Sequence, residues 1–199
     1  MSVDTKPITL TEIAAHNGFV ICLSSSKNGN RTQIMMWKQI LNFRQGKVGL
    51  PCFQVEIDDA VLRIALRVDI SEPSQPRSVF ACISKSRIYR YQVHCVESLN
   101  AAQPVAKLVD ECESVSTESL NCIALDCFGE MVATCEGSNV VVRSEQLRRI
   151  RTFRQSDAKL LSFSGSKVVA LQFSGSLIIA IDELGCITVN CENNPRNMR

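Results

Sequence analysis

The sequence contains only two histidines, His16 and His94, and this scarcity restricts the catalytic chemistry that it can support. A nucleophilic mechanism needs a histidine or a carboxylate beside an activated serine or cysteine. His94 adjoins Cys95, but neighbouring residues on a strand point to opposite faces of the sheet. The sequence also lacks a Walker-type phosphate loop and a dinucleotide fingerprint. We therefore expect that the protein is not an enzyme and that it binds no cofactor.

Long apolar runs are missing as well. No segment approaches the ~20 apolar residues that a membrane-spanning helix needs, and the apolar runs that are present have the length of strands. Met1–Leu23 lacks the apolar core and the small-residue cleavage pattern of a secretory signal. We expect a soluble, cytoplasmic protein without a membrane span, and peripheral membrane association stays open.

An excess of charge of one sign is also absent, because the net charge is only +2. Such a balance produces no general field that would attract nucleic acid or an anionic membrane. The hydrophobic fraction of 45% is ordinary for a globular protein with a buried core. We expect other protein subunits as partners and no DNA, with RNA as the less favoured alternative.

Cysteine, in contrast, is abundant, since the chain has 10. Several cysteines lie inside apolar runs, such as Val20–Leu23 and Phe80–Ile83, where a thiol behaves as a small apolar side chain. A disulfide framework is not expected without a secretory signal. The sequence therefore favours buried free thiols over disulfides or metal ligands.

The cysteine spacing is also poor for a metal site. Cys122 and Cys127, like Cys186 and Cys191, are separated by four residues. Five positions along one strand place two thiols on opposite faces of the sheet, so such a pair does not chelate zinc unless a bulge or a turn intervenes. We expect no metal.

Short apolar runs that end at Gly, Ser, Asn or Asp dominate the chain and predict strands joined by tight turns. Four pairs of runs read as hairpins: Phe19–Ser24 with Thr32–Lys38, Ser78–Ser84 with Arg87–Val93, Met131–Cys135 with Val140–Arg143, and Leu177–Ile181 with Cys186–Asn190. A further strand precedes each of the last three hairpins, at Leu62–Ile70, Cys122–Phe128 and Val168–Phe173. More polar fourth strands are expected at Phe53–Ile57, Val105–Val109 and Ile150–Arg154.

The hairpin turns at Gly29, Lys85, Gly137 and Leu184 recur about every 50 residues, close to the length of one four-stranded propeller blade. We therefore predict an all-β fold of about four WD40-like β-propeller blades, with an incomplete ring and a β-sandwich as alternatives. The predicted domain covers residues 18–191, after an N-terminal segment 1–17 and before a C-terminal tail 192–199. Insertions are expected at 42–51, 71–76 and 97–119. Thr9–Ile13 is a candidate for a short helix, with Thr9 as its cap.

One cluster of basic residues is a candidate partner-binding site, and it consists of Arg143, Arg148, Arg149, Arg151 and Arg154. An outer strand that carries such a cluster could bind an acidic protein, a phosphoinositide or RNA. The alternative is a solvated edge strand, because charge on edge strands prevents stray strand pairing. No aromatic residues interleave with these arginines as they do in single-strand nucleic-acid sites.

Two segments resemble degenerate blades of the WD40 type. In Ile123–Thr134 and Val168–Ile181, an apolar strand, a small turn and a second apolar strand precede a tight hairpin. The Trp-Asp and Gly-His pairs of typical WD40 repeats are absent, since Trp37 is followed by Lys38. The resemblance implies a β-propeller without an active site.

Within that group, the layout resembles the N-terminal propeller of the Hermansky–Pudlak syndrome protein 3 family, in Phe19–Trp37, Phe53–Leu66 and Ile123–Val142. This resemblance implies a scaffold subunit of a complex for the biogenesis of lysosome-related organelles. Our leading hypothesis is accordingly a non-catalytic protein-interaction scaffold, for example in vesicle trafficking. The alternative is an accessory subunit in RNA processing or tRNA modification that binds RNA, in a salt-sensitive way, through Arg143–Arg154. A hydrolase that uses Cys95 or Cys127 is a third, less favoured hypothesis.

Overall fold

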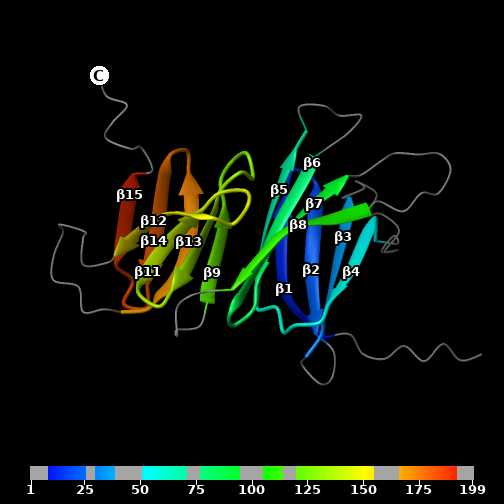
Figure 1. Ribbon diagram of the computed structural model, residues 1–199, viewed down its shortest axis with the longest axis horizontal. Coiled ribbons are helices and arrows are strands. Elements are labelled where there is room, and N and C mark those ends of the chain that lie inside the picture. The colour runs from blue at the N-terminus through cyan, green and yellow to red at the C-terminus, as the bar shows by residue number, and fades with distance from the viewer. Residues whose placement is uncertain are drawn as a thin grey trace, which may run out of the picture.

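A computed structural model describes residues 9–25, 30–38, 51–70, 77–94, 105–113, 120–154 and 166–191. All regular elements within these residues are β-strands. They form four antiparallel sheets, each of strands that follow one another in the chain (Figure 1). No helix in these ranges has the length and apolar character to cross a membrane. The predicted all-β class with about four blades is confirmed.

Each sheet is one propeller blade, numbered here in chain order. Blade 1 contains β1 (Thr9–His16), β2 (Phe19–Ser25), β3 (Thr32–Lys38) and β4 (Phe53–Ile57). Blade 2 contains β5 (Arg63–Asp69), β6 (Arg77–Ile83), β7 (Arg87–His94) and β8 (Val105–Glu113). Blade 3 contains β9 (Leu120–Leu125), β10 (Val132–Glu136), β11 (Asn139–Arg143) and β12 (Arg149–Arg154). Blade 4 has three described strands, β13 (Val168–Ser174), β14 (Leu177–Asp182) and β15 (Ile187–Cys191).

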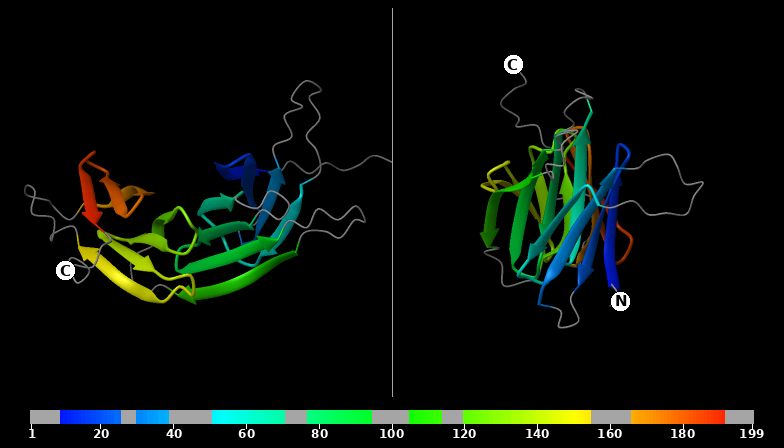
Figure 2. Two further views of the ribbon diagram at one scale, coloured as in Figure 1. Left: turned by 90° about the horizontal axis from the view of Figure 1, so that it is seen from above. Right: turned by 90° about the vertical axis from the view of Figure 1, so that its right-hand side faces the viewer.

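The blades follow one another around a common axis. The first strand of each blade packs against the first strand of the next, so that β5 contacts both β1 and β9, and β9 also contacts β13. Figure 2 shows the blades as an arc, with blade 1 in blue at one end and blade 4 in orange and red at the other. Among the described strands, the extensive contacts between blades join only neighbours in this series.

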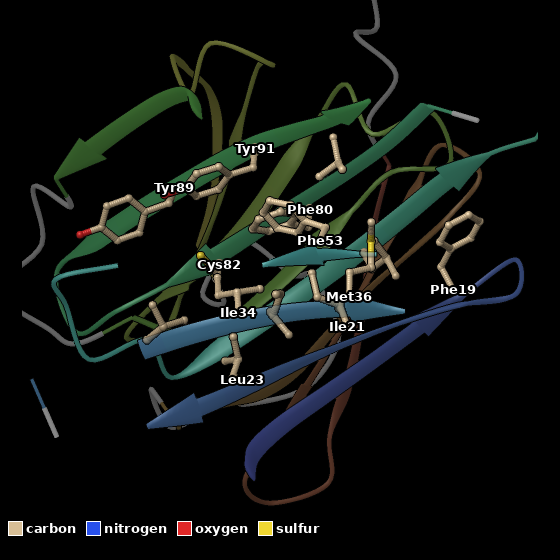
Figure 3. Close-up of a cluster of buried hydrophobic side chains, with 14 of the residues drawn as sticks. Phe19, Ile21, Leu23, Ile34, Met36, Phe53, Phe80, Cys82, Tyr89 and Tyr91 are labelled. Carbon is tan, nitrogen blue, oxygen red and sulfur yellow. The ribbon is translucent and has the colours of Figure 1, made fainter. Parts of the chain in front are cut away.

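Three apolar cores hold neighbouring blades together. They form because most strands either alternate apolar and polar side chains or are apolar on both faces, and so have an apolar face to bury. The core between blades 1 and 2 is the largest and contains aromatic, aliphatic and sulfur side chains (Figure 3). In it the rings of Phe80 and Tyr91 stack at 4.7 Å between centroids. The core between blades 2 and 3 includes Val79 and Leu125, and the core between blades 3 and 4 includes Val140 and Ile178.

The chain between blades 1 and 2 is fixed by a small polar network. Thr32 Oγ1 donates to the carbonyl of Asp59 at 2.9 Å and accepts the N–H of Val61 at 2.9 Å. The hydroxyl of Tyr89 donates to the carboxylate of Asp59 at 2.8 Å. These bonds satisfy backbone groups where the chain passes from one blade to the next.

The four hairpins are those predicted from the sequence, but the start of the chain is different. Residues Thr9–Ile13, the candidate helix, lie in strand β1, which pairs with β2 along its whole length apart from one irregularity between Leu10 and Glu12. Pairing with an apolar neighbour outweighs the weak local capping signal. The sheet of blade 1 therefore begins within segment 1–17, which the sequence placed before the domain.

Strand β8 runs from Val105 to Glu113 and pairs with β7, which confirms the fourth strand predicted at Val105–Val109. It also fills part of the segment 97–119 that was expected to be an insertion. The Gly29 turn, the insertion at 71–76 and residues 42–50 of the first insertion lie outside the described residues, as does the C-terminal tail 192–199.

Candidate protein-interaction surfaces

Of the five arginines in the predicted cluster, Arg143 differs from the prediction because it is not at the surface. Its side chain is buried and pairs with the carboxylate of Glu136, which is itself buried. Arg149 also approaches Glu136, at 3.5 Å between nitrogen and oxygen. The charge of Arg143 is thus neutralised inside blade 3, and its guanidinium is not available to a partner. The sequence could not show this, because Glu136 and Arg143 come to share one face of the sheet only once β10 and β11 fold into a hairpin, with Glu136 opposite Asn139 and Arg143 opposite Val132.

The rest of the cluster lies along the outer edge of blade 3. Among the described strands, β12 is the last strand of its sheet and pairs with β11 alone. Arg148, Arg149 and Arg151 are exposed, and so is the apolar side chain of Ile150. Arg154 is the last residue of the same strand. We call the residues 148–154 the basic edge of blade 3.

One member of the basic edge has an aromatic neighbour. The guanidinium of Arg151 lies over the ring of Phe153 at 4.6 Å from its centroid, in cation–π geometry. Phe153 is half-buried and packs against the core between blades 3 and 4. Because Arg151 covers this ring, the ring is poorly placed to stack on a nucleotide base.

Among the described residues that were weighed for catalysis, His16 has a structural role. Nδ1 of His16 accepts the N–H of Val68 at 3.1 Å, a bond from blade 1 to blade 2. Desolvation and the nearby Arg67 lower the pKa of His16, which keeps the ring neutral and able to accept. The neighbouring Asn17 donates to the carbonyl of Val68 at 2.7 Å. His16 therefore joins two blades.

Seven cysteines within the described ranges are free thiols, namely Cys22, Cys82, Cys112, Cys122, Cys127, Cys135 and Cys186. Cys122 and Cys135 lie next to each other in the core between blades 3 and 4, and the hydrogen bond with Cys122 together with burial raises the pKa of Cys135. Burial likewise raises the pKa of Cys82. Such thiols are unreactive at neutral pH. Cys127 is exposed, and Cys95 lies outside the described residues.

The described residues hold no group of three His, Cys, Asp or Glu side chains that would ligate a metal ion.

A second surface, which the sequence analysis did not single out, is the face of blade 4 that points away from blade 3. Ile187 is 64% exposed and Val189 is 55% exposed on β15, and Leu177 on β14 is also exposed. The register places Ile179 opposite Val189 and Ile181 opposite Ile187, so these side chains share one face. In the sequence, the alternation of Ile187, Thr188 and Val189 indicates a strand with Ile187 and Val189 on one face.

No protein-family model matches the chain, and no curated protein matches its sequence. Solved structures do match its fold. The β-propeller domain of Cps50 (Swd1) from Myceliophteria thermophila superposes with a TM-score of 0.64 and 13% identity, over 92% of this chain and 54% of that one. KlAtg21, in complex with the coiled coil of AgAtg16, gives a TM-score of 0.57 and 15% identity over 94% of this chain and 53% of that one.

The computationally designed protein Ika4 gives a TM-score of 0.53 and 12% identity, over 96% of both chains. Together these likenesses show a WD40-like β-propeller fold with four blades. The chain spans about half the length of the Cps50 propeller and of KlAtg21. None of the matches supports the resemblance to the Hermansky–Pudlak syndrome protein 3 family.

Proposed function

We propose that this protein is a non-catalytic scaffold that binds other protein subunits, and that the basic edge of blade 3 is one of its binding surfaces. The observation that carries the proposal is the outermost position of β12, with exposed Arg148, Arg149 and Arg151 around exposed Ile150. An edge strand leaves backbone N–H and C=O groups unpaired on its outer side.

The chemistry of this edge fits an extended acidic segment of a partner. Such a segment can add to β12 as a further strand, so that backbone hydrogen bonds supply affinity. Carboxylates spaced two residues apart lie on one face of the added strand and can meet Arg151, while an apolar residue can cover Ile150. Arg149 lies on the opposite face of β12, because the register with β11 shifts between Val142 and Arg143. Protein binding by a propeller has a precedent in KlAtg21, which is solved together with a coiled coil.

The test is charge reversal at two residues that do not pair with the buried Glu136. Arg148→Glu with Arg151→Glu should abolish binding of a fluorescent peptide of alternating valine and glutamate, measured by anisotropy. The matched control is Arg31→Glu with Arg63→Glu, which makes the same change in charge at exposed residues of blades 1 and 2. Equal loss in both variants, or no binding by the wild type, would contradict the proposed edge.

The same titration addresses the RNA alternative. A single-stranded oligouridine that binds tighter than the peptide, with affinity falling steeply with salt, would favour an accessory subunit in RNA processing or tRNA modification. The covered ring of Phe153 favours the protein partner instead.

A finer proposal places the scaffold in the cytoplasm, in a vesicle-trafficking complex for lysosome-related organelles. It is supported by the resemblance of Phe19–Trp37, Phe53–Leu66 and Ile123–Val142 to the Hermansky–Pudlak syndrome protein 3 family. Affinity purification from native cells, with wild type and the Arg148/Arg151 variant compared by quantitative mass spectrometry, tests it. Trafficking subunits that disappear from the variant sample are the expected result, whereas RNA-processing factors would contradict it.

A further inference from the structure

The two end faces of the blade arc carry exposed apolar side chains, and no other blade covers these faces in the described residues. At one end lies the face of blade 4 with Leu177, Ile179, Ile181, Ile187 and Val189, which we call the blade 4 end face. In stacked-repeat proteins a terminal repeat normally has a polar outer face, because that face meets water. The blade 4 end face does not follow this rule.

The opposite end of the arc has a matching surface. In β1, Ile13 is 60% exposed and Leu10 is 54% exposed. Ile13 pairs with Cys22 on β2, on the face that points away from the core with blade 2, and Leu10 pairs with Ser24 on the same face. Half-buried Val20 and Trp37 lie opposite each other on that face. We call the face with these residues the blade 1 end face.

The packing of successive blades within the chain indicates which surface should cover each end face. The first strands pack in series, β1 on β5, β5 on β9 and β9 on β13. The next contact in this series would join β13 to another β1. Val169 on β13 is exposed, as are Leu10 and Ile13 on β1. The blade 4 end face is therefore the partner that the packing pattern requires for a blade 1 end face.

The chain spans about half the length of two of the propellers that its fold resembles. Four blades cover 54% of the Cps50 propeller domain and 53% of KlAtg21. Propellers close with about 4 to 8 blades. Two copies of this chain related by a twofold axis would supply eight blades, at the upper end of that range.

We propose that two copies of this chain associate through their end faces and close an eight-bladed ring. Each junction joins the blade 4 end face of one copy to the blade 1 end face of the other, so the ring contains two identical junctions. Burial of the exposed apolar side chains on the two faces drives the association. The exposed charge of Glu56 lies in the row of Leu10, at the β4 edge of the blade 1 end face. This inference concerns the end faces alone and does not depend on the basic edge of blade 3.

The first test is the mass of the wild-type chain in solution, measured by sedimentation velocity over a range of concentrations. A mass of two chains is expected, and a monomer at all concentrations would overturn the proposal. Ile187→Asp and Ile13→Lys change exposed side chains, so each variant should keep the circular dichroism spectrum of the wild type. Each should weaken association by roughly a hundredfold or more, because each places an unpaired charge in both junctions.

Mixing the two variants gives the decisive result. A dimer of one Ile187→Asp chain and one Ile13→Lys chain contains one wild-type junction and one junction with an Asp–Lys pair, so mixing should restore the mass of two chains. In a dimer that joins two blade 4 end faces, Ile13→Lys would associate normally, and that result would overturn the proposed arrangement. The control is Phe128→Asp in the turn between β9 and β10, where an exposed apolar side chain lies away from both end faces; loss of dimer in this control would also count against the proposal.

Discussion

Arg90 on β7 crosses from blade 2 to blade 3 and donates from Nη2 to the backbone carbonyl of Gly129 at 2.7 Å. The residue is fully buried, and its Nε has no hydrogen-bond partner among the described residues. Burial lowers its pKa, and the negative charges of Glu145, Asp126 and Glu130 act in the opposite direction. Arg67 makes a parallel contact, from Nε to the carbonyl of Asp126 at 3.0 Å. Two arginines of blade 2 thus hold the turn between β9 and β10.

Replacing Arg90 with Met should destabilise the protein because it removes the bond to Gly129 while keeping much of the packed volume. We expect a loss of about 1.5–3 kcal/mol in the free energy of unfolding, measured by urea denaturation. Arg87→Met is the control, because Arg87 pairs with Glu113 at the surface. It should leave the urea midpoint almost unchanged. Equal effects of the two substitutions would show that Arg90 does not join the blades.

Replacing Glu136 with Leu should have a larger effect, since it leaves the buried guanidinium of Arg143 without its counter-charge. The expected loss is about 3–5 kcal/mol in unfolding free energy. Adding Arg143→Met should recover most of this loss, because the double variant replaces the buried ion pair with apolar side chains. Denaturation of the two single variants and the double variant gives the coupling energy. Additive losses would argue against a buried pair.

Acidification should weaken the junction between blades 1 and 2 through His16. Its pKa in the folded protein lies below the unfolded value of about 6.5. The unfolded chain therefore binds this proton first, so the contribution is fully present above about pH 6.5 and is lost as the pH falls through the folded pKa. His16→Gln keeps an acceptor for Val68 but cannot titrate. Thermal melting between pH 7 and 5 should fall less in this variant than in wild type, and identical slopes would exclude His16 as the cause.

Alanine at Gly129 should be costlier than alanine at Gly175. Both glycines have positive φ, at +71° and +59°, where a side chain costs about 1–2 kcal/mol. At Gly129 an added Cβ would also approach Cβ of Val79 in blade 2 to 3.2 Å, whereas at Gly175 it would meet nothing within 4 Å. Overpacking adds about 1–3 kcal/mol to the first substitution. Equal losses in unfolding free energy would show that blades 2 and 3 can separate slightly at this point.

The hairpins could be predicted from the sequence because turn residues and apolar runs are local signals. The four predicted pairs lie in β2–β3, β6–β7, β10–β11 and β14–β15. Strand β1 could not be predicted in this way, because Thr9–Ile13 is short and the adjacent polar residues Thr11 and Glu12 break the alternation of a strand, which forms by pairing with β2. The basic edge was predicted as a run of arginines, but the burial of Arg143 depends on the opposing strand. Charge alone does not show which side of a strand faces the core.

Every blade is built from consecutive strands, and none borrows a strand from a distant part of the described chain. Many hydrogen bonds therefore join strands within a blade, whereas apolar contact and a few polar bonds, such as those of Arg90 and His16, join one blade to the next. Such an architecture allows evolution by whole blades, because a blade can be duplicated or deleted without breaking the hydrogen bonds of another sheet. Mechanical force applied across the arc should for the same reason part whole blades before any strand peels away from its neighbours.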